Sequence, residues 1–258
     1  CLTSIKNTMT RFKLLIEYDG TGFVGWQSQK NGPSIQETIE NAITNFCGEK
    51  ILVQGAGRTD AGVHAYGQVA HVDIKRHFKP ETVRDAINAH LRSSPISVLS
   101  VEETTDQFHA RFSAKERVYI YRIINRSAPL TVDKNRAWKI TTPLNAMAMH
   151  DSAQILIGEH DFTSFRAKQC QASSPVKTLS TLQVNKIEEK IEVLARAPSF
   201  LHHQVRNIVG TLKLVGEGKW TLNDVSAALK ARDRKVAGPT APPEGLFLMN
   251  VSYPKNTF

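Results

Sequence analysis

The chain has 258 residues, which is long enough for one large domain or two small ones with full hydrophobic cores. A hydrophobic fraction of 41% and a charged fraction of 22% are ordinary for a globular protein in water. No apolar run approaches the roughly 20 residues that span a bilayer, which argues against an integral membrane protein. The net charge of +9, from 33 basic and 24 acidic residues, favours an anionic partner. Nucleic acid ranks ahead of a membrane surface, and a merely soluble basic protein is the plainer alternative.

The cysteines and the first residues indicate the cellular setting. Cys1, Cys47 and Cys170 are odd in number and far apart, which argues against a disulfide framework and against a Cys-rich zinc site. We therefore expect a reducing, cytoplasmic compartment. The opening residues are polar and lack the hydrophobic region of a signal peptide. Met9 is a plausible start, so residues 1–8 are expected to be an N-terminal extension.

The first half of the chain has the pattern of a ferredoxin-like unit. Ser34 and Glu37 have the spacing of a capping box at the start of an amphipathic helix, and Pro80 suits the first turn of a second helix. The apolar periodicity predicts strand, helix, strand, strand, helix and strand at residues 11–18, 34–47, 51–54, 67–74, 80–91 and 96–103. This order predicts an antiparallel sheet covered by helices on one face.

A similar order follows in the second half. Strands are predicted at 118–124, 178–184, 190–196 and 246–253, and helices at 143–157, at 201–215 and after a cap at Thr221. The sequence therefore predicts an α+β protein with two halves, residues 9–112 and 113–258. With no long linker between the halves, their sheets are expected to join.

Residues 54–65 form a glycine-rich stretch with one carboxylate, Asp60, in its middle. Gly55, Gly57 and Gly62 permit unusual backbone angles and close approach of a ligand. Arg58 and His64 flank Asp60, which suggests a reactive anion held between cations.

Two phosphate-binding motifs fail on this stretch. The dinucleotide fingerprint would place its third glycine at Asp60, where a carboxylate repels a pyrophosphate. The P-loop would require Lys and Ser or Thr where Val63 and His64 stand. A nucleotide-dependent enzyme is therefore disfavoured.

Several other segments combine aromatic and charged residues. Phe108–Phe112 interleaves aromatics with His and Arg, as in segments that stack on bases, although its Phe residues can equally belong to the core. Tyr119 lies on a predicted strand, where packing is the commoner role. His202 and His203 are placed on a predicted helix, where adjacent side chains point about 100° apart and do not ligate one metal together. Arg206, on the same predicted helix, needs an anion if it is buried.

Together these segments resemble the tRNA pseudouridine synthases of the TruA family, from about Met9 to Pro254. The matching blocks are Tyr18-Asp19-Gly20-Thr21 with Gly25-Trp26-Gln27, Ala56–Ala65, Phe108–Ala114, His160-Asp161-Phe162 with Ser164–Ala167, Phe200–His203 with Val205-Arg206-Asn207, and Ala241-Pro242-Pro243 with Gly245-Leu246. The chain departs from the family pattern at 196–200, before the His pair, which puts the local turn in question.

The resemblance implies the pseudouridine synthase fold, two ferredoxin-like halves that share a continuous antiparallel sheet. It also implies conversion of uridine to pseudouridine at positions 38, 39 and 40 in the anticodon stem-loop of tRNA, a homodimer, and no cofactor or metal. A catalytically silent RNA-binding protein on the same fold is the rival hypothesis.

The resemblance also implies roles for individual residues. Asp60 is the expected nucleophile, attacking ribose C1′ or base C6 or assisting a glycal route, and the sequence leaves these alternatives open. Arg206 is expected to pair with Asp60, and Tyr119 to stack on the extruded uracil. The expected substrate contacts are Arg58, Leu246, Phe108, His109, Arg111, Arg166, His202 and His203.

Overall fold

The computed structural model describes residues 9–254, so the expected extension at 1–8 lies outside the described residues. These residues divide into two compact units. Unit 1 holds the residues up to Lys115 together with those from Asn250 onward, and unit 2 is Glu116–Met249. Within the described part of the chain, none of the helices is both long and apolar enough to cross a membrane.

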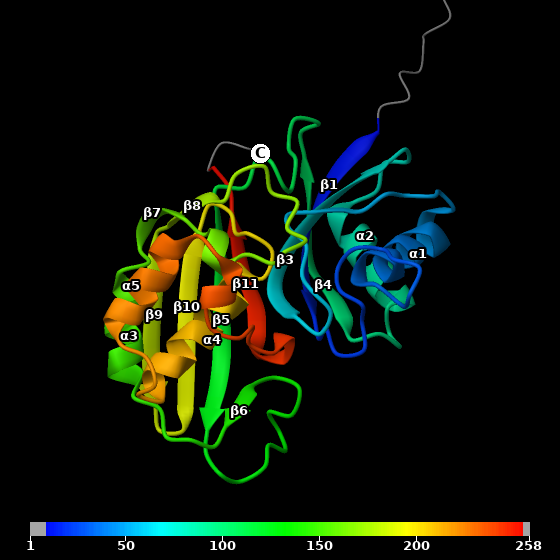
Figure 1. Cartoon of the computed structure of the whole chain (residues 1–258). Helices are drawn as coiled ribbons and strands as arrows, with labels where there is room; N and C mark the ends of the chain where they lie inside the picture. The colour runs from blue at the N-terminus through cyan, green and yellow to red at the C-terminus, as the bar shows by residue number, and fades with distance from the viewer. Residues whose placement is uncertain (1–8, 255–258) are drawn as a thin grey trace, which may run out of the picture. The chain divides into compact units, whose positions relative to one another are not determined.

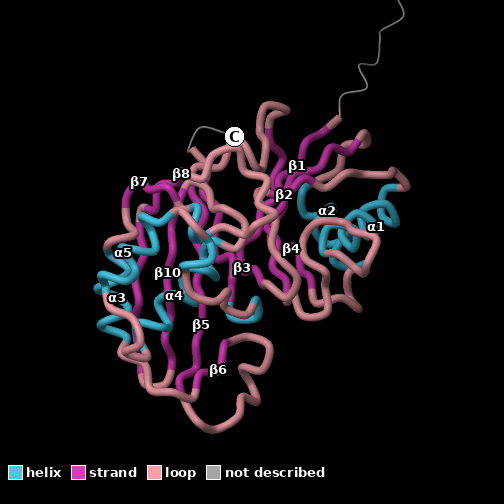
Figure 2. The backbone as a smooth tube through the Cα atoms, in the orientation of Figure 1, coloured by secondary structure: helices cyan, strands magenta, loops and turns pink. Residues whose placement is uncertain are grey.

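Unit 1 contains the predicted alternation of strands and helices. Its elements are β1 (Thr10–Tyr18), α1 (Ile35–Cys47), β2 (Gln54–Gly55), β3 (His64–Ile74), α2 (Pro80–His90) and β4 (Ile96–Thr104). β1 lies between β3 and β4 and is antiparallel to both. In β1, Phe12, Leu14 and Ile16 are fully buried, while the residues between them are partly exposed. This alternation gives the sheet one apolar face, and Figure 2 shows α1 and α2 together beside it.

The local signals of the sequence explain most of these bounds. Ser34 caps α1 by accepting a hydrogen bond from the Glu37 amide at 3.2 Å. Gly48 ends the helix in the left-handed conformation, with φ of 73°. The strand predicted at 51–54 is wrong in extent, because only Gln54–Gly55 joins the ladder. Ile51 and Val53 are buried and Leu52 is exposed, so the alternation there reflects burial of an irregular segment.

Unit 2 repeats the combination of sheet and helices with more elements. Its strands are β5 (Glu116–Asn125), β6 (Trp138–Ile140), β7 (Gly158–Asp161), β8 (Val176–Leu179), β9 (Thr181–Ile187) and β10 (Lys190–Ala197). Its helices are α3 (Ala146–Gln154), α4 (Gln204–Gly216) and α5 (Leu222–Ala231), with the short 3-10 turns η1 (Thr163–Phe165), η2 (Arg234–Val236) and η3 (Pro243–Gly245). In Figure 1, α3, α4 and α5 lie over β5, β10 and β9.

Two details of unit 2 differ from the expectation. The predicted strand 178–184 is interrupted at Ser180: β8 pairs with β7, whereas β9 forms the hairpin with β10. β6 pairs with β5 in the parallel sense, so the sheet is not wholly antiparallel.

Thr221 and Asp224 form the complete capping box of α5, as the sequence predicts.

The last strand, β11 (Leu246–Ser252), contributes residues to both units. The order of hydrogen-bonded strands is β4-β1-β3-β11-β5-β10-β9. The strands and helices of each unit confirm the predicted α+β class.

Candidate active site

Asp60 lies in unit 1, in the loop between β2 and β3. Its side chain is partly buried, Thr59 before it is buried, and Arg58 is exposed. The amide of Val63 donates to the carbonyl of Asp60 at 3.1 Å and closes a turn. Gly62 adopts a φ of 77° within this turn, which a residue with a side chain adopts only with strain. The backbone freedom predicted from the glycines is therefore used here.

The segment at Gly25 and Trp26 holds one side of the loop. Gly25 forms a β-bridge with Asp60, and the amide of Trp26 donates to the carbonyl of Thr59 at 3.0 Å. A Cβ atom at Gly25 would lie 2.6 Å from that same carbonyl oxygen, which no side chain can tolerate. The backbone of this segment therefore packs directly against the loop that carries Asp60.

The end of β1 holds the other side. The hydroxyls of Tyr18 and Thr59 are 2.8 Å apart in the interior, and burial raises the pKa of Tyr18 to about 12. A Cβ atom at Gly20 would lie 2.1 Å from the carbonyl oxygen of Val63, so this approach also requires glycine. The side chain of buried Gln68, on β3, donates to the carbonyl of Gly57 at 2.9 Å.

His64 has a structural position in this loop. It is 2% exposed, and its Nδ1 accepts a hydrogen bond from the amide of Gly20 at 3.0 Å. The same nitrogen lies 3.1 Å from a carboxylate oxygen of Asp19. Buried His64 therefore joins the loop to the turn after β1, and its charge beside Asp60 stays a prediction.

The segment 108–112 separates its two aromatic residues. Phe108 is fully buried against Tyr253 and His71, which fits the core alternative that the sequence left open. Phe112 is 76% exposed, with its ring centroid 4.4 Å from that of His109. The guanidinium of Arg111 lies 5.6 Å from the centroid of the Phe112 ring. The exposed side chains of this segment are therefore Arg111 and Phe112.

A polar network holds this segment on β1 and β3 of unit 1. Arg11 forms a two-pronged ion pair with Asp73, with both distances 2.7 Å, and donates to the carbonyl of Phe108 at 2.8 Å. Nδ1 of buried His71 accepts from the amide of Ala110 at 3.1 Å, and the Tyr253 hydroxyl donates to the Ala110 carbonyl at 2.7 Å. The segment is thus anchored at Phe108 and at Ala110.

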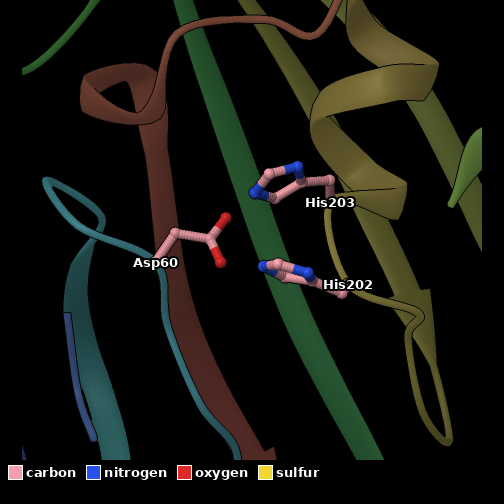
Figure 3. Close-up of side chains that lie close together, drawn as sticks. All are labelled: Asp60, His202 and His203. Carbon is pink, nitrogen blue, oxygen red and sulfur yellow. The ribbon is translucent and has the colours of Figure 1, made fainter. Parts of the chain in front are cut away.

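In unit 2, the His pair precedes α4 and is not part of it. His203 is the N-cap, with a φ of 63°, and α4 begins at Gln204. The prediction that the two side chains diverge on a helix is wrong for this reason. Their ring centroids are 4.0 Å apart, and Figure 3 shows both rings extending to the same side of the chain. Figure 3 also draws Asp60, on its loop of unit 1.

Arg166 belongs to a neighbouring segment of unit 2. The residue after it, Ala167, donates from its amide to the carbonyl of His202 at 2.9 Å. Arg166 follows η1, where Asp161 accepts hydrogen bonds from the amide and hydroxyl of Thr163. Burial acts to raise the pKa of Asp161, but these hydrogen bonds and the charge of Arg232 together hold it below its usual value.

The two tyrosines of β5 have different surroundings. Tyr119 is partly exposed and meets the ring of Phe200 edge-on, with centroids 5.2 Å apart. Tyr121 is fully buried, and its hydroxyl donates to the carbonyl of Pro242 at 2.8 Å. A Cβ atom at Gly245 would lie 2.6 Å from the Tyr121 ring, which explains a glycine immediately before buried Leu246.

Arg206 lies in the first turn of α4 and is partly buried. Its Nε donates to the carbonyl of Ala241 at 2.8 Å. The sequence pattern points to Arg206. It does not distinguish Arg234, which supports the segment that contains Ala241, from the other cations of a basic stretch.

Comparison with known proteins identifies the class of enzyme to which this fold and glycine-rich loop belong. A family model described as tRNA pseudouridine synthase matches residues 14–113 and 152–254. The chain therefore belongs to the tRNA pseudouridine synthases, a family of isomerases, and the predicted resemblance is confirmed.

Curated relatives narrow the similarity to one branch of this family. The chain is 56% identical over 245 residues to "tRNA pseudouridine synthase A" of Parvibaculum lavamentivorans, covering 95% of this chain and 100% of that protein. It is 56% identical over 249 residues to the protein of the same name from Rhodospirillum rubrum, covering 96% and 90%. With that of Xanthobacter autotrophicus it shares 57% over 245 residues, covering 95% and 100%.

Proposed function

We propose that this tRNA pseudouridine synthase acts on uridines 38, 39 and 40 of the anticodon stem-loop, with Asp60 as its nucleophile. The observation that carries the proposal is the support around Asp60. Its loop is held by backbone contacts from Gly20 and Gly25 and by the buried hydroxyl pair of Tyr18 and Thr59. Such support fixes where a carboxylate stands, which a reacting group requires and simple RNA binding does not.

The reaction suits a carboxylate. The N1–C1′ bond breaks, the uracil turns, and a C5–C1′ bond forms, while C5 loses the proton that N1 finally gains. Asp60 can attack C1′ and release the uracil, add to C6 of the base, or assist a glycal route. In each route the carboxylate is released again, so the isomerisation needs no external energy source.

We further propose that residues of unit 2 act on the same uridine. Arg206 keeps Asp60 ionised and oriented, because a guanidinium stabilises the charged form of a carboxylate. Tyr119 stacks on the extruded uracil and assists proton removal from C5, with Phe200 bracing its ring from the edge. Leu246 forms the apolar wall of the pocket.

The remaining contacts are proposed for the RNA around that uridine. Exposed Arg58 supports base extrusion or positions a phosphate, and Arg166, His202 and His203 lie on adjoining segments of unit 2. His109 and Arg111 contact the RNA from unit 1. Phe108 is buried, so we assign its expected contact to Phe112, whose ring is exposed. A homodimer with tRNA spanning both subunits completes the proposal.

Position specificity is tested with unmodified tRNA transcripts that carry uridine at only one of positions 38, 39 and 40. Each transcript is incubated with the protein, and pseudouridine is mapped along the RNA. Product at these positions and nowhere else is the expected result. Product elsewhere would refute the proposed target, and no product on any tRNA would favour the silent RNA-binding alternative.

The role of Asp60 is tested with Asp60→Asn. This variant should bind tRNA with the wild-type Kd and form no detectable product, because an amide is a poor nucleophile. Asp133→Asn, at an exposed loop position, is the matched control and should retain wild-type turnover. Normal turnover by Asp60→Asn would refute the assignment.

The proposed dimer and RNA surface have independent tests. Sedimentation should give twice the chain mass in the absence of tRNA, and a monomer that remains fully active would refute the dimer. Affinity for tRNA should fall steeply with salt concentration, because each neutralised phosphate releases counterions. Salt-independent binding would contradict a broad basic RNA surface.

A further inference from the structure

The side chain of Arg206 is held by the segment before β11. Its Nε donates to the carbonyl of Ala241 at 2.8 Å, and the amide of Ala241 donates to the carbonyl of Arg206 at 3.1 Å. This reciprocal pair joins the first turn of α4 to one residue of the proline-rich segment. Because a guanidinium is planar, a fixed Nε also fixes the plane of the two terminal nitrogens.

The segment 238–241 lies directly on the backbone of α4. A Cβ atom at Gly210 would lie 1.7 Å from the carbonyl oxygen of Pro239, and one at Gly238 would lie 2.6 Å from Cα of Thr211. The amide of Gly238 donates to the hydroxyl of Thr211 at 3.0 Å, and that hydroxyl donates to the carbonyl of Asn207 at 2.8 Å. Glycine on both sides thus permits a contact between two backbones.

Arg234, in η2, connects this segment to α4. Its Nη1 donates to the carbonyl of Gly238 at 2.9 Å. Its Nη2 donates to Oδ1 of Asn207 and to the hydroxyl of Thr240, both at 3.0 Å. The Thr240 hydroxyl in turn donates to Oδ1 of Asn207 at 2.7 Å. Asn207 is fully buried, and its amide nitrogen donates to the carbonyl of Phe165 at 2.8 Å.

We infer that Arg234, acting with Asn207 and Thr240, is a positioning residue that sets the orientation of Arg206 through Ala241. The inference rests on the proposed function of Arg206. Each acceptor named above is a neutral carbonyl, amide or hydroxyl group, so the fork geometry of Arg234 matters as well as its charge. A displacement of Ala241 would move the acceptor of Nε and turn the plane of the Arg206 guanidinium.

Two substitutions test the inference from different sides. Arg234→Lys keeps the charge but loses the fork, and Thr240→Val keeps the shape but loses the hydroxyl. Each should slow single-turnover pseudouridine formation, by about 10- to 100-fold for Arg234→Lys and less for Thr240→Val, because small displacements of a reacting group cost rate. The Kd for tRNA should stay within about twofold, since the hydrogen bonds of Arg234 go to groups of the chain itself. Lys235→Ala, at the exposed neighbouring position, is the control and should behave as wild type.

A double-mutant cycle separates positioning from general stability. In an Arg206→Lys background, adding Arg234→Lys should slow the reaction no further, because the orientation that Arg234 maintains is already lost. Rate losses that multiply would show an independent structural effect and overturn the inference. If Arg234→Lys fails to fold, Thr240→Val in the same cycle decides.

The inference and the proposed function fail in different ways. Wild-type rates for both Arg234→Lys and Thr240→Val would overturn the inference and leave the role of Arg206 intact. Wild-type turnover by Arg206→Ala would refute the role of Arg206 itself, and with it the reason for positioning that side chain.

Discussion

The hydroxyl of Tyr18 lies 2.8 Å from the hydroxyl of Thr59, the residue directly before Asp60. Both side chains lie in the interior of unit 1. The pair joins the end of β1 to a loop residue that lies 41 positions later in the sequence. Both residues are buried, and the side chain of Gln68 is a further hydrogen-bond partner of the Tyr18 hydroxyl. This bond therefore connects the stability of unit 1 to the position of the proposed nucleophile.

We predict that Thr59→Val destabilises the protein by about 1 to 2 kcal/mol and slows pseudouridine formation, because the Tyr18 hydroxyl is left buried without this partner. Thr59→Ser keeps the hydroxyl and should lose less on both counts. Urea unfolding gives the free energy, and single-turnover kinetics on a tRNA transcript gives the rate. Equal rates for the two variants would show that the bond does not position Asp60.

Gly20 and Gly57 form a second matched pair. A Cβ atom at Gly20 would lie 2.1 Å from the carbonyl oxygen of Val63, whereas one at Gly57 meets nothing within 4 Å. Gly20→Ala should therefore cost about 2 kcal/mol or more of unfolding free energy and displace the Asp60 loop. Gly57→Ala should fold as wild type. Thermal unfolding of both variants is the measurement, and equal midpoints would contradict the close packing of Gly20 on Val63.

A kinetic comparison of Gly57→Ala with wild type adds information about the substrate. If the variant folds normally but has a raised KM, the RNA approaches the loop backbone at Gly57 closely, as the proposed site requires. A wild-type KM would place the RNA backbone elsewhere.

Stability should fall as the pH drops below neutrality, in part because of His71. Burial lowers the pKa of His71 from 6.5 to about 4, and the charges of Arg11 and His109 act in the same direction. At pH values between about 4 and 6.5, His71 binds a proton in the unfolded chain but not in the folded protein. The free energy of unfolding therefore decreases as the pH falls. We expect a loss of about 1 to 2 kcal/mol between pH 7 and pH 5 from this residue.

The control for this effect is His71→Asn, whose side-chain oxygen can accept from the Ala110 amide without titrating. Urea unfolding at a series of pH values should show a weaker pH dependence for the variant than for the wild type. Identical pH dependence would mean that His71 contributes nothing to it.

The two phenylalanines of segment 108–112 should respond oppositely to truncation. Phe108→Ala removes a fully buried ring and should destabilise the protein by about 3 to 5 kcal/mol. Phe112→Ala removes a ring that is 76% exposed, so stability should change little. If Phe112 stacks on an unpaired base, its removal should weaken tRNA binding by roughly 1 to 3 kcal/mol. Filter binding measures this, and unchanged affinity would remove Phe112 from the RNA surface.

Much of the fold follows from local patterns in the sequence. The alternation of Phe12, Leu14 and Ile16, the cap at Ser34 and the capping box at Thr221 each predict an element that the structure contains. Patterns that depend on pairing were less informative. Ile51–Val53 alternates like a strand without joining the ladder, and the break at Ser180 redirects β8 to β7. Partner choice is a long-range property that a short window of sequence does not contain.

For the site, the residue types can be predicted from the sequence: a carboxylate in a glycine-rich loop, and an arginine at the start of an otherwise apolar helix. The contacts that hold these residues appear only in the folded chain. Four features depend on contacts between segments that are distant in the sequence. They are the packing of Gly20 on Val63, the acceptor role of Nδ1 of His64, the burial of Phe108 beside exposed Phe112, and the hydrogen bond from Arg234 to Asn207. The physical reason is that close packing and hydrogen-bond direction are set by the neighbours that folding brings together, whereas glycine, histidine and arginine each suit several such surroundings.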